Sequence, residues 1–116
     1  MSTGKPGAKV LWIKEEYLKL ILAGRKTVEV RVAYSNLTRL HAGDRLLLNE
    51  RHAFQIVRIT RYADFEHLLA AEDAGYIAPD LAPGELLRIL RRLYPPEKEA
   101  LGALAIEIVP EAATPT

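Results

Sequence analysis

Apolar residues recur at helical spacing in the segment 15–23 and then switch to strict alternation, and this change of period is the strongest structural signal in the chain. Tyr17, Leu18 and Ile21 stand three and four residues apart, which predicts a short amphipathic helix. Gly24 follows the last apolar turn, where a glycine commonly closes a helix in the left-handed conformation. The pattern therefore predicts a helix that ends at Gly24 and is followed at once by a strand.

The predicted strand collects polar side chains on one face. Because neighbouring side chains of a strand point to opposite faces, burial of Val28, Val30 and Val32 places Thr27, Glu29 and Arg31 together on the other face. Lys26 is expected in the preceding turn, from which its long side chain can reach Glu29 and Arg31. The alternative interpretation is a solvated ion pair of Glu29 with Arg31, worth roughly 0–1 kcal/mol.

The rest of the chain shows the same two periods between clear turn signals. Apolar runs predict strands at 9–14, 45–49, 54–62 and 103–109, and helical spacing predicts helices at 65–74 and 83–94. Gly75 is expected to stop the first of these helices, and the segments 76–81 and 97–101 are expected to be irregular.

The order of the elements predicts the fold class. Five strands, interrupted by helices only after the first and the fourth, favour an α+β domain built on a small, mostly antiparallel sheet or barrel. In the last strand alternation places three residues inward, Leu104, Ile106 and Ile108, and three outward, Ala103, Ala105 and Glu107.

Length and composition set limits on this domain. With 116 residues the chain has the length of one domain, in which we expect an ordered part at 9–109 and disordered tails at 1–8 and 110–116. No apolar run approaches the roughly 20 residues of a membrane span, and the polar segment 1–7 lacks the apolar core of a secretory signal, so we expect a cytoplasmic protein. The absence of cysteine excludes disulfides, thiolate metal sites and a cysteine nucleophile.

Arginine dominates the basic residues, although the net charge is only +1. Ten of the sixteen basic residues are arginine, which suits bidentate contact with phosphate or carboxylate, or a compositional bias toward thermostability. Arg58 and Arg61 are an odd number of residues apart and point to opposite strand faces unless a bulge intervenes. On the helix 83–94, three arginines share the side opposite the apolar spine and form either a solvated face or a phosphate-binding stripe: Arg88, Arg91 and Arg92.

Aromatic and histidine residues give weaker signals. Trp12 lies in an apolar run and is expected in the core, with stacking on a nucleic-acid base as the alternative. The three histidines, His41, His52 and His67, are scattered and show no metal-ligand spacing, so we expect no metal site and no cofactor.

Residues of the helix–strand segment also match a known signature. Gly24, Lys26, Glu29 and Arg31 fit the pattern G-x-K-x-x-E-x-R, in which the chain resembles the ASCH domain family. Two further features agree with that family, namely the Gly43-Asp44 turn and the Tyr94-Pro95 pair before the last strand. The resemblance implies a PUA-like β-barrel of about five strands with two to three helices, a cleft beside the motif, and association with RNA or nucleosides.

The resemblance also suggests one enzymatic activity. Some small ASCH proteins look like acetylcytidine amidohydrolases, which use a lysine and a threonine from this region and a distant glutamate. Lys26 matches the lysine, but Glu29 occupies the position of the threonine, and Thr27 lies two residues earlier. The distant carboxylate has no single counterpart and falls among Glu72, Asp73 and Asp80.

Three functional hypotheses remain open from the sequence. In a module that binds RNA or a modified nucleoside, Lys26 and Arg31 would donate hydrogen bonds, Trp12 or Tyr34 would stack on a base, and Gly24 would shape the site. In a hydrolase without metal, Lys26, Glu29 and Thr27 would be the catalytic candidates, with a charged Lys26 steadying an oxyanion and Glu29 activating water. A scaffold domain would do neither.

Overall fold

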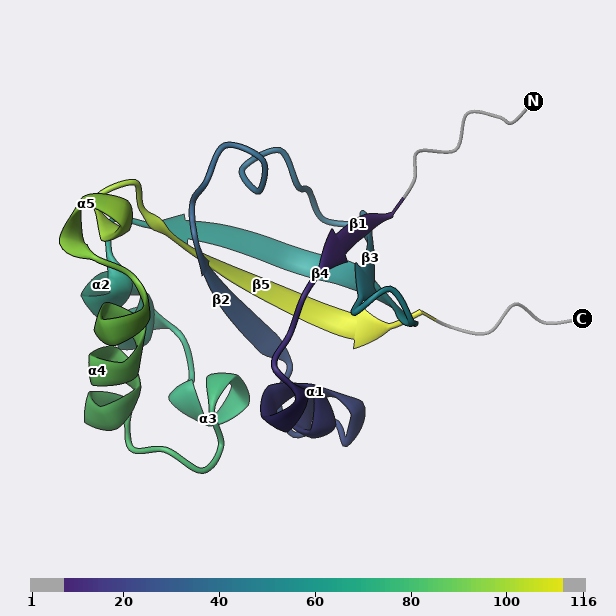
Figure 1. The fold of residues 1–116 in the computed structure, drawn as a ribbon, viewed down its shortest axis with the longest axis horizontal. Helices are drawn as coiled ribbons and strands as arrows, with labels where there is room; N and C mark the ends of the chain where they lie inside the picture. The colour runs from purple at the N-terminus through teal and green to yellow at the C-terminus, as the bar shows by residue number, and fades with distance from the viewer. Residues whose placement is uncertain (1–7, 112–116) are drawn as a thin grey trace, which may run out of the picture.

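The computed structural model describes residues 8–111, which form a curled five-stranded sheet with helices at one edge and over one face (Figure 1). The elements in chain order are β1 (Lys9–Leu11), α1 (Glu15–Leu22), β2 (Val28–Val32), β3 (Arg45–Leu48), β4 (His52–Tyr62), α2 (Phe65–Ala71), α3 (Ala74–Ile77), α4 (Pro83–Leu93), α5 (Pro96–Glu99) and β5 (Ala103–Pro110).

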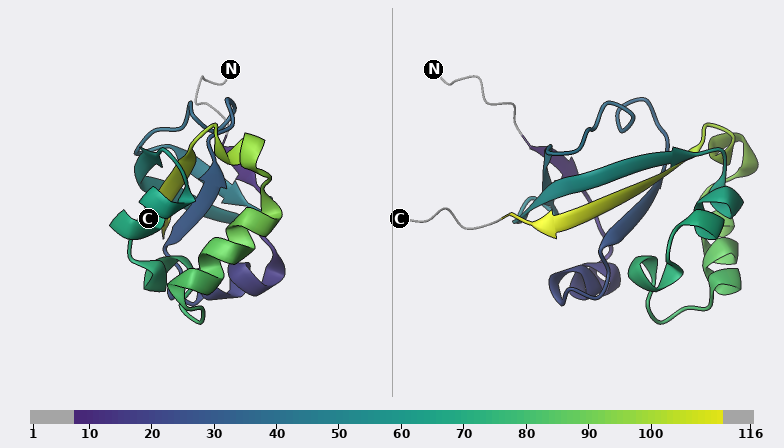
Figure 2. Two further views of the ribbon diagram at one scale, coloured as in Figure 1. Left: turned by 90° about the vertical axis from the view of Figure 1, so that its left-hand side faces the viewer. Right: turned by 180° about the vertical axis from the view of Figure 1, so that it is seen from behind.

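The sheet has the strand order β1-β3-β4-β5-β2, and only β1 with β3 is a parallel pair. Its centre is the long antiparallel pair β4–β5, which runs the length of the molecule (Figure 2). Helices α2 to α5 all lie in the connection between these two strands, and the pair of Tyr62 with Ala103 closes that connection. β1 and β2 form the two edges of the sheet, so among residues 8–111 the barrel stays open between them.

Two apolar clusters lie on the two faces of the sheet. The first is enclosed by the curled sheet and covered by α1, and includes Leu18, Ile21, Leu46 and Ile106. The second lies between β2, β5 and the helices α2 to α4, and includes all three valines of β2 together with Phe65, Leu68, Leu86 and Leu90. Glu29 and Arg31 therefore extend from the face of β2 opposite the second cluster, as alternation predicts.

The structure corrects the outward placement of two alanines. Ala103 and Ala105 are fully buried in the second cluster, while Leu104 and Ile106 fill the first. Both faces of this part of β5 are covered, because α2 and α4 pack against the side that alternation alone leaves to solvent. The small alanine side chains allow the helices to approach the sheet closely.

The α+β class and the mostly antiparallel sheet are confirmed, but over the described residues 8–111 the barrel is open and there are five helices where two to three were expected. Gly75 does not stop a helix: α2 ends before Glu72, and Gly75 lies inside the short α3. The next helix, α3, begins directly after Asp73, whose carboxylate accepts a hydrogen bond from the Gly75 N–H. The segment 97–101, expected to be irregular, contributes to α5, which begins at Pro96.

The expected disordered tails lie mostly outside the described residues. At the C-terminal side the ordered chain extends beyond Val109, since Pro110 ends β5. Glu111 accepts two hydrogen bonds from the Arg45 guanidinium, with the shorter at 2.7 Å.

Asn49, in the tight turn after β3, fixes the segment that leads from β1 into α1. Asn49 and Glu50 both have positive φ, at 52° and 59°, and asparagine tolerates this conformation better than most residues. The Asn49 side-chain amide accepts from the Ile13 N–H (2.7 Å) and donates to the Ile13 carbonyl (2.9 Å). Its own N–H donates to the Leu11 carbonyl. These hydrogen bonds of Asn49 continue the pairing of β1 with β3 beyond Leu11.

Replacement of Asn49 should separate the effect of these hydrogen bonds from that of backbone conformation. Asn49→Gly tolerates positive φ but leaves both polar groups of Ile13 without the amide, and should lower the free energy of unfolding by about 2 kcal/mol. Asn49→Ala should lose roughly 1 kcal/mol more, because alanine disfavours this φ. Urea unfolding measures both values, with the exposed Asn36→Ala as control. Equal stability of the glycine variant and the wild type would contradict a role for the amide.

Candidate functional site

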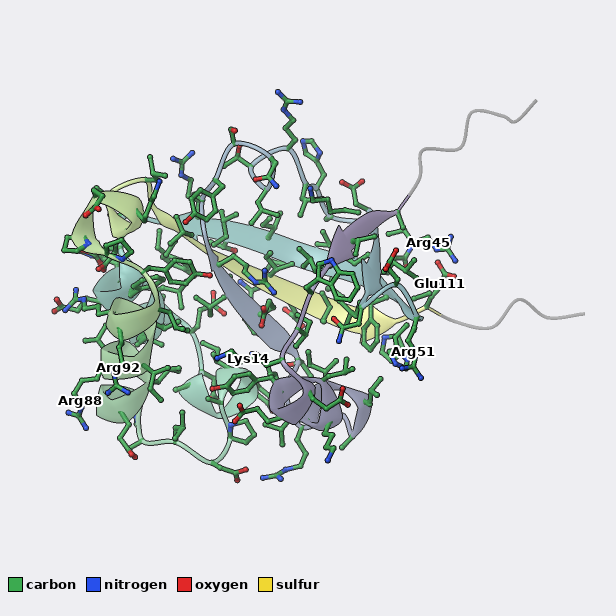
Figure 3. All side chains as sticks on the ribbon, in the orientation of Figure 1. Lys14, Arg45, Arg51, Arg88, Arg92 and Glu111 are labelled. Carbon is green, nitrogen blue, oxygen red and sulfur yellow. The ribbon has the colours of Figure 1, made fainter. Side chains whose placement is uncertain are left out.

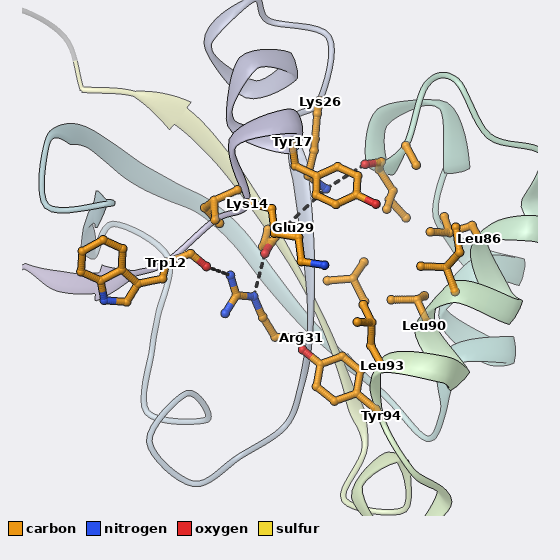
Figure 4. Close-up of a pocket in the computed structure, with 15 residues that line it drawn as sticks. Trp12, Lys14, Tyr17, Lys26, Glu29, Arg31, Leu86, Leu90, Leu93 and Tyr94 are labelled. Carbon is orange, nitrogen blue, oxygen red and sulfur yellow. Dashed lines mark hydrogen bonds and ion pairs between the residues drawn. The ribbon is translucent and has the colours of Figure 1, made fainter.

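A pocket of about 310 Å³ lies between α1 and α4, beside the edge strand β2 (Figure 4). Trp12, Lys14 and Tyr17 line the side formed by the β1–α1 segment. The opposite side is largely apolar and comes from α3 and α4, and Tyr94, just past the end of α4, completes it. The volume is near the lower end of the roughly 300–1,000 Å³ of small-ligand pockets, so the pocket has room for one small organic molecule.

Lys26, Glu29 and Arg31 meet in this pocket, as the sequence predicts. Lys26 Nζ lies 3.3 Å from Glu29 Oε1, and Arg31 Nε donates to Glu29 Oε2 at 2.6 Å. Side-chain exposure is 5% for Lys26, 12% for Glu29 and 21% for Arg31, so these ion pairs are shielded from water. The alternative of a solvated surface pair is therefore wrong.

Lys26 is held as an ammonium by three acceptors. Besides Glu29, its Nζ donates to the carbonyl of Val28 (2.8 Å) in β2 and to that of Ile77 (2.7 Å) in α3. Burial lowers the pKa of Lys26 from its ordinary value, and the Glu29 carboxylate acts in the opposite direction. Since a neutral amine has only two hydrogens, three surrounding acceptors match the charged form. Lys26 thus joins α3 to β2 and places a fixed positive charge at the floor of the pocket.

Arg31 bridges the open side of the sheet. While Nε contacts Glu29, one terminal nitrogen donates to the Trp12 carbonyl at 2.8 Å, which connects β2 with the segment after β1. A guanidinium has five N–H groups, and only these two have a partner within residues 8–111. Arg31 therefore presents a rigid donor edge to a ligand in the pocket.

Trp12 lies at the rim of the pocket and not in the core, which corrects the expectation for it. Its side chain is 63% exposed, whereas Leu11 and Ile13 are buried on either side of it. The period of two along this segment could have predicted this position: if Leu11 and Ile13 are buried, Trp12 between them points outward. Figure 4 shows the backbone carbonyl of Trp12 facing Arg31, while the indole ring extends away from the other residues of the pocket.

Three other predicted residues lie away from the pocket. Thr27 precedes β2 and borders a different hollow, beside Arg58 and Tyr62. Tyr34 borders a third hollow, where the Lys98 ammonium lies 5.8 Å from its ring centre. Gly24 has φ +78° and ends α1, so its role is to reverse the chain.

The three candidate distal carboxylates also lie outside the pocket. Glu72 accepts a bidentate pair from Arg58 and a hydrogen bond from the Tyr62 hydroxyl, and the Arg58 contact lowers its pKa. Asp73 caps α3, and Asp80 pairs with Arg25 at 2.9 Å. Within residues 8–111, each of these carboxylates already has a structural partner.

The arginines considered as basic surfaces, on β4 and on α4, do not form one shared surface in the structure. A bulge lies between Ile56 and Arg58, which leaves regular alternation from Arg58 to Arg61 and points the two arginines to opposite faces, as expected. On α4, Arg91 contacts Glu66 and Glu99. Arg88 and Arg92 are exposed.

Sequence reasoning missed several residues of the pocket. Lys14 was assigned only to the end of the first strand, Tyr17 only to the apolar side of the first helix, and Ile89 was assigned no role. Tyr94 was noted only as part of the Tyr-Pro pair. Burial raises the pKa of Tyr94, so its hydroxyl is protonated at neutral pH and can donate.

Residues 8–111 contain no cluster of three or more potential metal ligands. His41 and His67 each lie beside an aspartate of their own segment. No helix in the same part of the chain has both the length and the hydropathy to cross a membrane.

The buried position of Lys26 predicts a large effect on stability. Lys26→Met keeps most of the side-chain volume but leaves one oxygen of Glu29 and two carbonyls without their cationic partner, so the free energy of unfolding should fall by about 3–5 kcal/mol. Lys19→Met, on the exposed face of α1, is the control and should change stability by less than about 0.5 kcal/mol. Denaturant unfolding compares the two. A loss below roughly 1 kcal/mol for Lys26→Met would contradict the bridging role.

Known proteins with a similar sequence or structure agree with the fold. The sequence matches the ASCH domain family over residues 11–112. The crystal structure of hypothetical protein PH0355 is similar, with a TM-score of 0.85 and 27% identity over 90% of this chain and 100% of that one. The solution NMR structure of protein PF0455 from Pyrococcus furiosus is also 27% identical, with a TM-score of 0.75 over 90% of this chain and 97% of that one. No protein of curated function matches the sequence. This chain belongs to the ASCH domain family.

Proposed function

We propose that this protein binds RNA or a modified nucleoside, with one base held in the pocket between α1 and α4. ASCH domains are generally associated with RNA, and three residues of the G-x-K-x-x-E-x-R pattern line this pocket, namely Lys26, Glu29 and Arg31. In single-stranded RNA the bases are unstacked and can enter such a pocket one at a time. The volume of about 310 Å³ suits a single base with its sugar better than a longer segment.

The observation that carries the proposal is the orientation of Arg31. Contacts to Glu29 and to the Trp12 carbonyl hold the guanidinium in place (Figure 4), and among the described residues its other N–H groups have no partner. Such an edge selects a planar ligand with carbonyl or ring-nitrogen acceptors, which describes a nucleic-acid base. A hydrogen bond from a charged group contributes roughly 1.5–3 kcal/mol.

The other sides of the pocket suit the faces of a base. Val30, Ile89 and Leu93 give an apolar surface against which a ring can pack, and the exposed Trp12 side chain would have to turn toward the pocket to stack on the other side. Lys14 and Tyr94 add donors at the edge. A flat ring with a polar edge therefore satisfies both kinds of surface in the pocket.

The contacts of the motif favour binding over amide hydrolysis. Both side chains are engaged by protein groups: Lys26 Nζ donates to two carbonyls and pairs with Glu29, and each oxygen of Glu29 contacts a cation. Thr27 and the candidate distal carboxylates lie elsewhere. Burial lowers the pKa of Lys26, as a lysine base would require, but the carboxylates expected to assist it lie outside the pocket. Release of acetate from acetylcytidine by wild type but not by Glu29→Gln would overturn this choice.

Substitution of Arg31 should weaken ligand binding at unchanged charge. Arg31→Lys cannot contact Glu29, the Trp12 carbonyl and a base at the same time, so affinity for the best ligand from a panel of nucleosides and short RNAs should fall at least about ten-fold. Arg61→Lys is the matched control, because Arg61 also donates to a backbone carbonyl, that of Leu101, but borders another hollow. Isothermal titration measures both, after a thermal-shift screen has identified the ligand. Equal affinity of the two variants would contradict the proposal.

Removal of the Trp12 ring should affect binding but not folding. Because the side chain is largely exposed, Trp12→Ala should change the free energy of unfolding by less than about 0.5 kcal/mol. The loss of a stacked base should cost about 1–3 kcal/mol of binding energy. Leu22→Ala, at another exposed apolar residue outside the pocket, is the control. Quenching of tryptophan fluorescence by the ligand in the wild type gives an independent measurement, and unchanged affinity of Trp12→Ala would exclude stacking.

A further inference from the structure

Val30 directs its main-chain N–H and carbonyl to the open edge of the sheet. In an antiparallel pair, alternate residues exchange hydrogen bonds with the partner strand, and the residues between them direct both main-chain groups to the other side. The Ile108 N–H donates to the Thr27 carbonyl, and the Ala33 N–H donates to the Gly102 carbonyl. The register of β2 with β5 is continuous between these two pairs. Because Val30 is three residues from each, its N–H and carbonyl point away from β5.

The Val30 N–H and carbonyl lack the partners that neighbouring groups of this edge have. The Val28 carbonyl accepts from Lys26 Nζ at 2.8 Å, and the Val32 carbonyl accepts from the Tyr34 N–H at 2.8 Å. Among residues 8–111, no hydrogen bond reaches either main-chain group of Val30, although this residue is only 7% exposed. Since buried main-chain polar groups nearly always have a partner, these two groups are candidates for contact with a ligand.

The pocket lies across this edge of β2. Glu29 and Arg31 line it from one face of the strand, and apolar residues of α4 line it from the other, as Figure 4 shows. A pocket that touches both faces of a strand passes over one of its edges, and β5 occupies the other edge of β2. Val30, between Glu29 and Arg31, also lines the pocket. Its N–H and carbonyl therefore face the space in which a ligand binds.

A donor beside an acceptor matches one edge of a nucleic-acid base. Every base has an adjacent hydrogen-bond donor and acceptor on its Watson–Crick edge, whereas a carboxylate or a phosphate diester offers acceptors alone. The main chain of Val30 can thus pair with that edge as it would with a neighbouring strand. The exposed Arg88 and Arg92 extend from the outer side of α4, away from this contact (Figure 3).

We propose that Val30 recognises the Watson–Crick edge of a base through its main-chain N–H and carbonyl. This inference rests on the proposed function and narrows it, because the pocket then accepts only unpaired bases with a free donor on that edge. A base that is paired in a duplex, or that carries methyl groups in place of the donor hydrogens, does not fit. Because the recognising groups belong to the main chain, a substitution of Val30 removes one of them only if it removes the N–H.

The first test compares matched nucleosides on the wild-type protein by isothermal titration. Four nucleosides lose a Watson–Crick donor without gaining charge: N3-methyluridine, N4,N4-dimethylcytidine, N6,N6-dimethyladenosine and N1-methylguanosine. For the parent nucleoside that binds best, the blocked form should bind at least about ten-fold more weakly, because a hydrogen bond is lost and the Val30 carbonyl meets a methyl group. The 5-methyl form of a pyrimidine or the 7-deaza form of a purine, altered on another edge, should bind within about three-fold of the parent.

The second test removes the Val30 N–H from the protein. Val30→Pro deletes an N–H that takes no part in the ladder with β5, and proline is tolerated on edge strands at such positions. The variant should fold and should bind the best nucleoside at least about ten-fold more weakly. Val28→Pro is the matched control, since the Val28 N–H also points away from β5 but this residue does not line the pocket. Its affinity should stay within about three-fold of the wild type.

The outcomes separate this inference from the function on which it rests. Equal affinity for the parent and the blocked nucleoside would overturn recognition by Val30 and leave base binding in the pocket intact. Equal affinity of a folded Val30→Pro variant and the wild type would do the same. Urea unfolding verifies the fold of both proline variants, and if Val30→Pro does not fold, the nucleoside series decides alone. If the wild-type protein bound neither nucleosides nor short RNAs, the proposed function would fail as well.

Discussion

The open edge between β1 and β2 is the constraint on which the site depends. A sheet that does not close leaves its edge strands without a hydrogen-bonded neighbour, and here a chain of charged side chains takes the place of the missing strand pairs. Arg31 reaches from β2 to the carbonyl of Trp12, Glu29 holds Arg31, and Lys26 continues the chain to the carbonyl of Ile77 in α3. The same three residues thus hold the walls of the pocket together and give it its polarity.

This double role explains why the ion pairs tolerate burial. Removing charges from water is costly, and each of these charges recovers part of that cost from several fixed partners. A ligand that fills the pocket shields the network further from solvent. Stability and ligand affinity should consequently be coupled at Lys26 and Glu29, whereas Trp12 contributes to the surface of the pocket without contributing to the core.

The sequence predicted the parts of the fold that depend on local period. The helix closed by Gly24, the alternating strand after it and the order of five strands follow from spacing alone, and so does the meeting of Lys26, Glu29 and Arg31. The prediction from alternation was wrong for Thr27. β2 begins at Val28, and the direction of a side chain in the turn before a strand does not follow the alternation of that strand. Ala103 and Ala105 were misplaced because only the packed helices, which are distant in sequence, reveal that both faces of β5 are covered. The partners of Glu72 and Asp80 likewise depend on contacts across the fold that spacing does not encode.

The connection from β4 to β5 has a consequence for how specificity can change. This connection starts after Tyr62 and ends before Ala103, which face each other in the sheet, and it includes all of α4. One wall of the pocket therefore belongs to the β4–β5 connection, and the other belongs to β2 and the β1–α1 segment. Substitutions or length changes in the connection can reshape the apolar wall without shifting the strand register that positions Glu29 and Arg31. The polar wall with Glu29 and Arg31 can thus stay constant while the apolar wall changes. Redesign of ligand preference is best begun at Ile89 and Leu93.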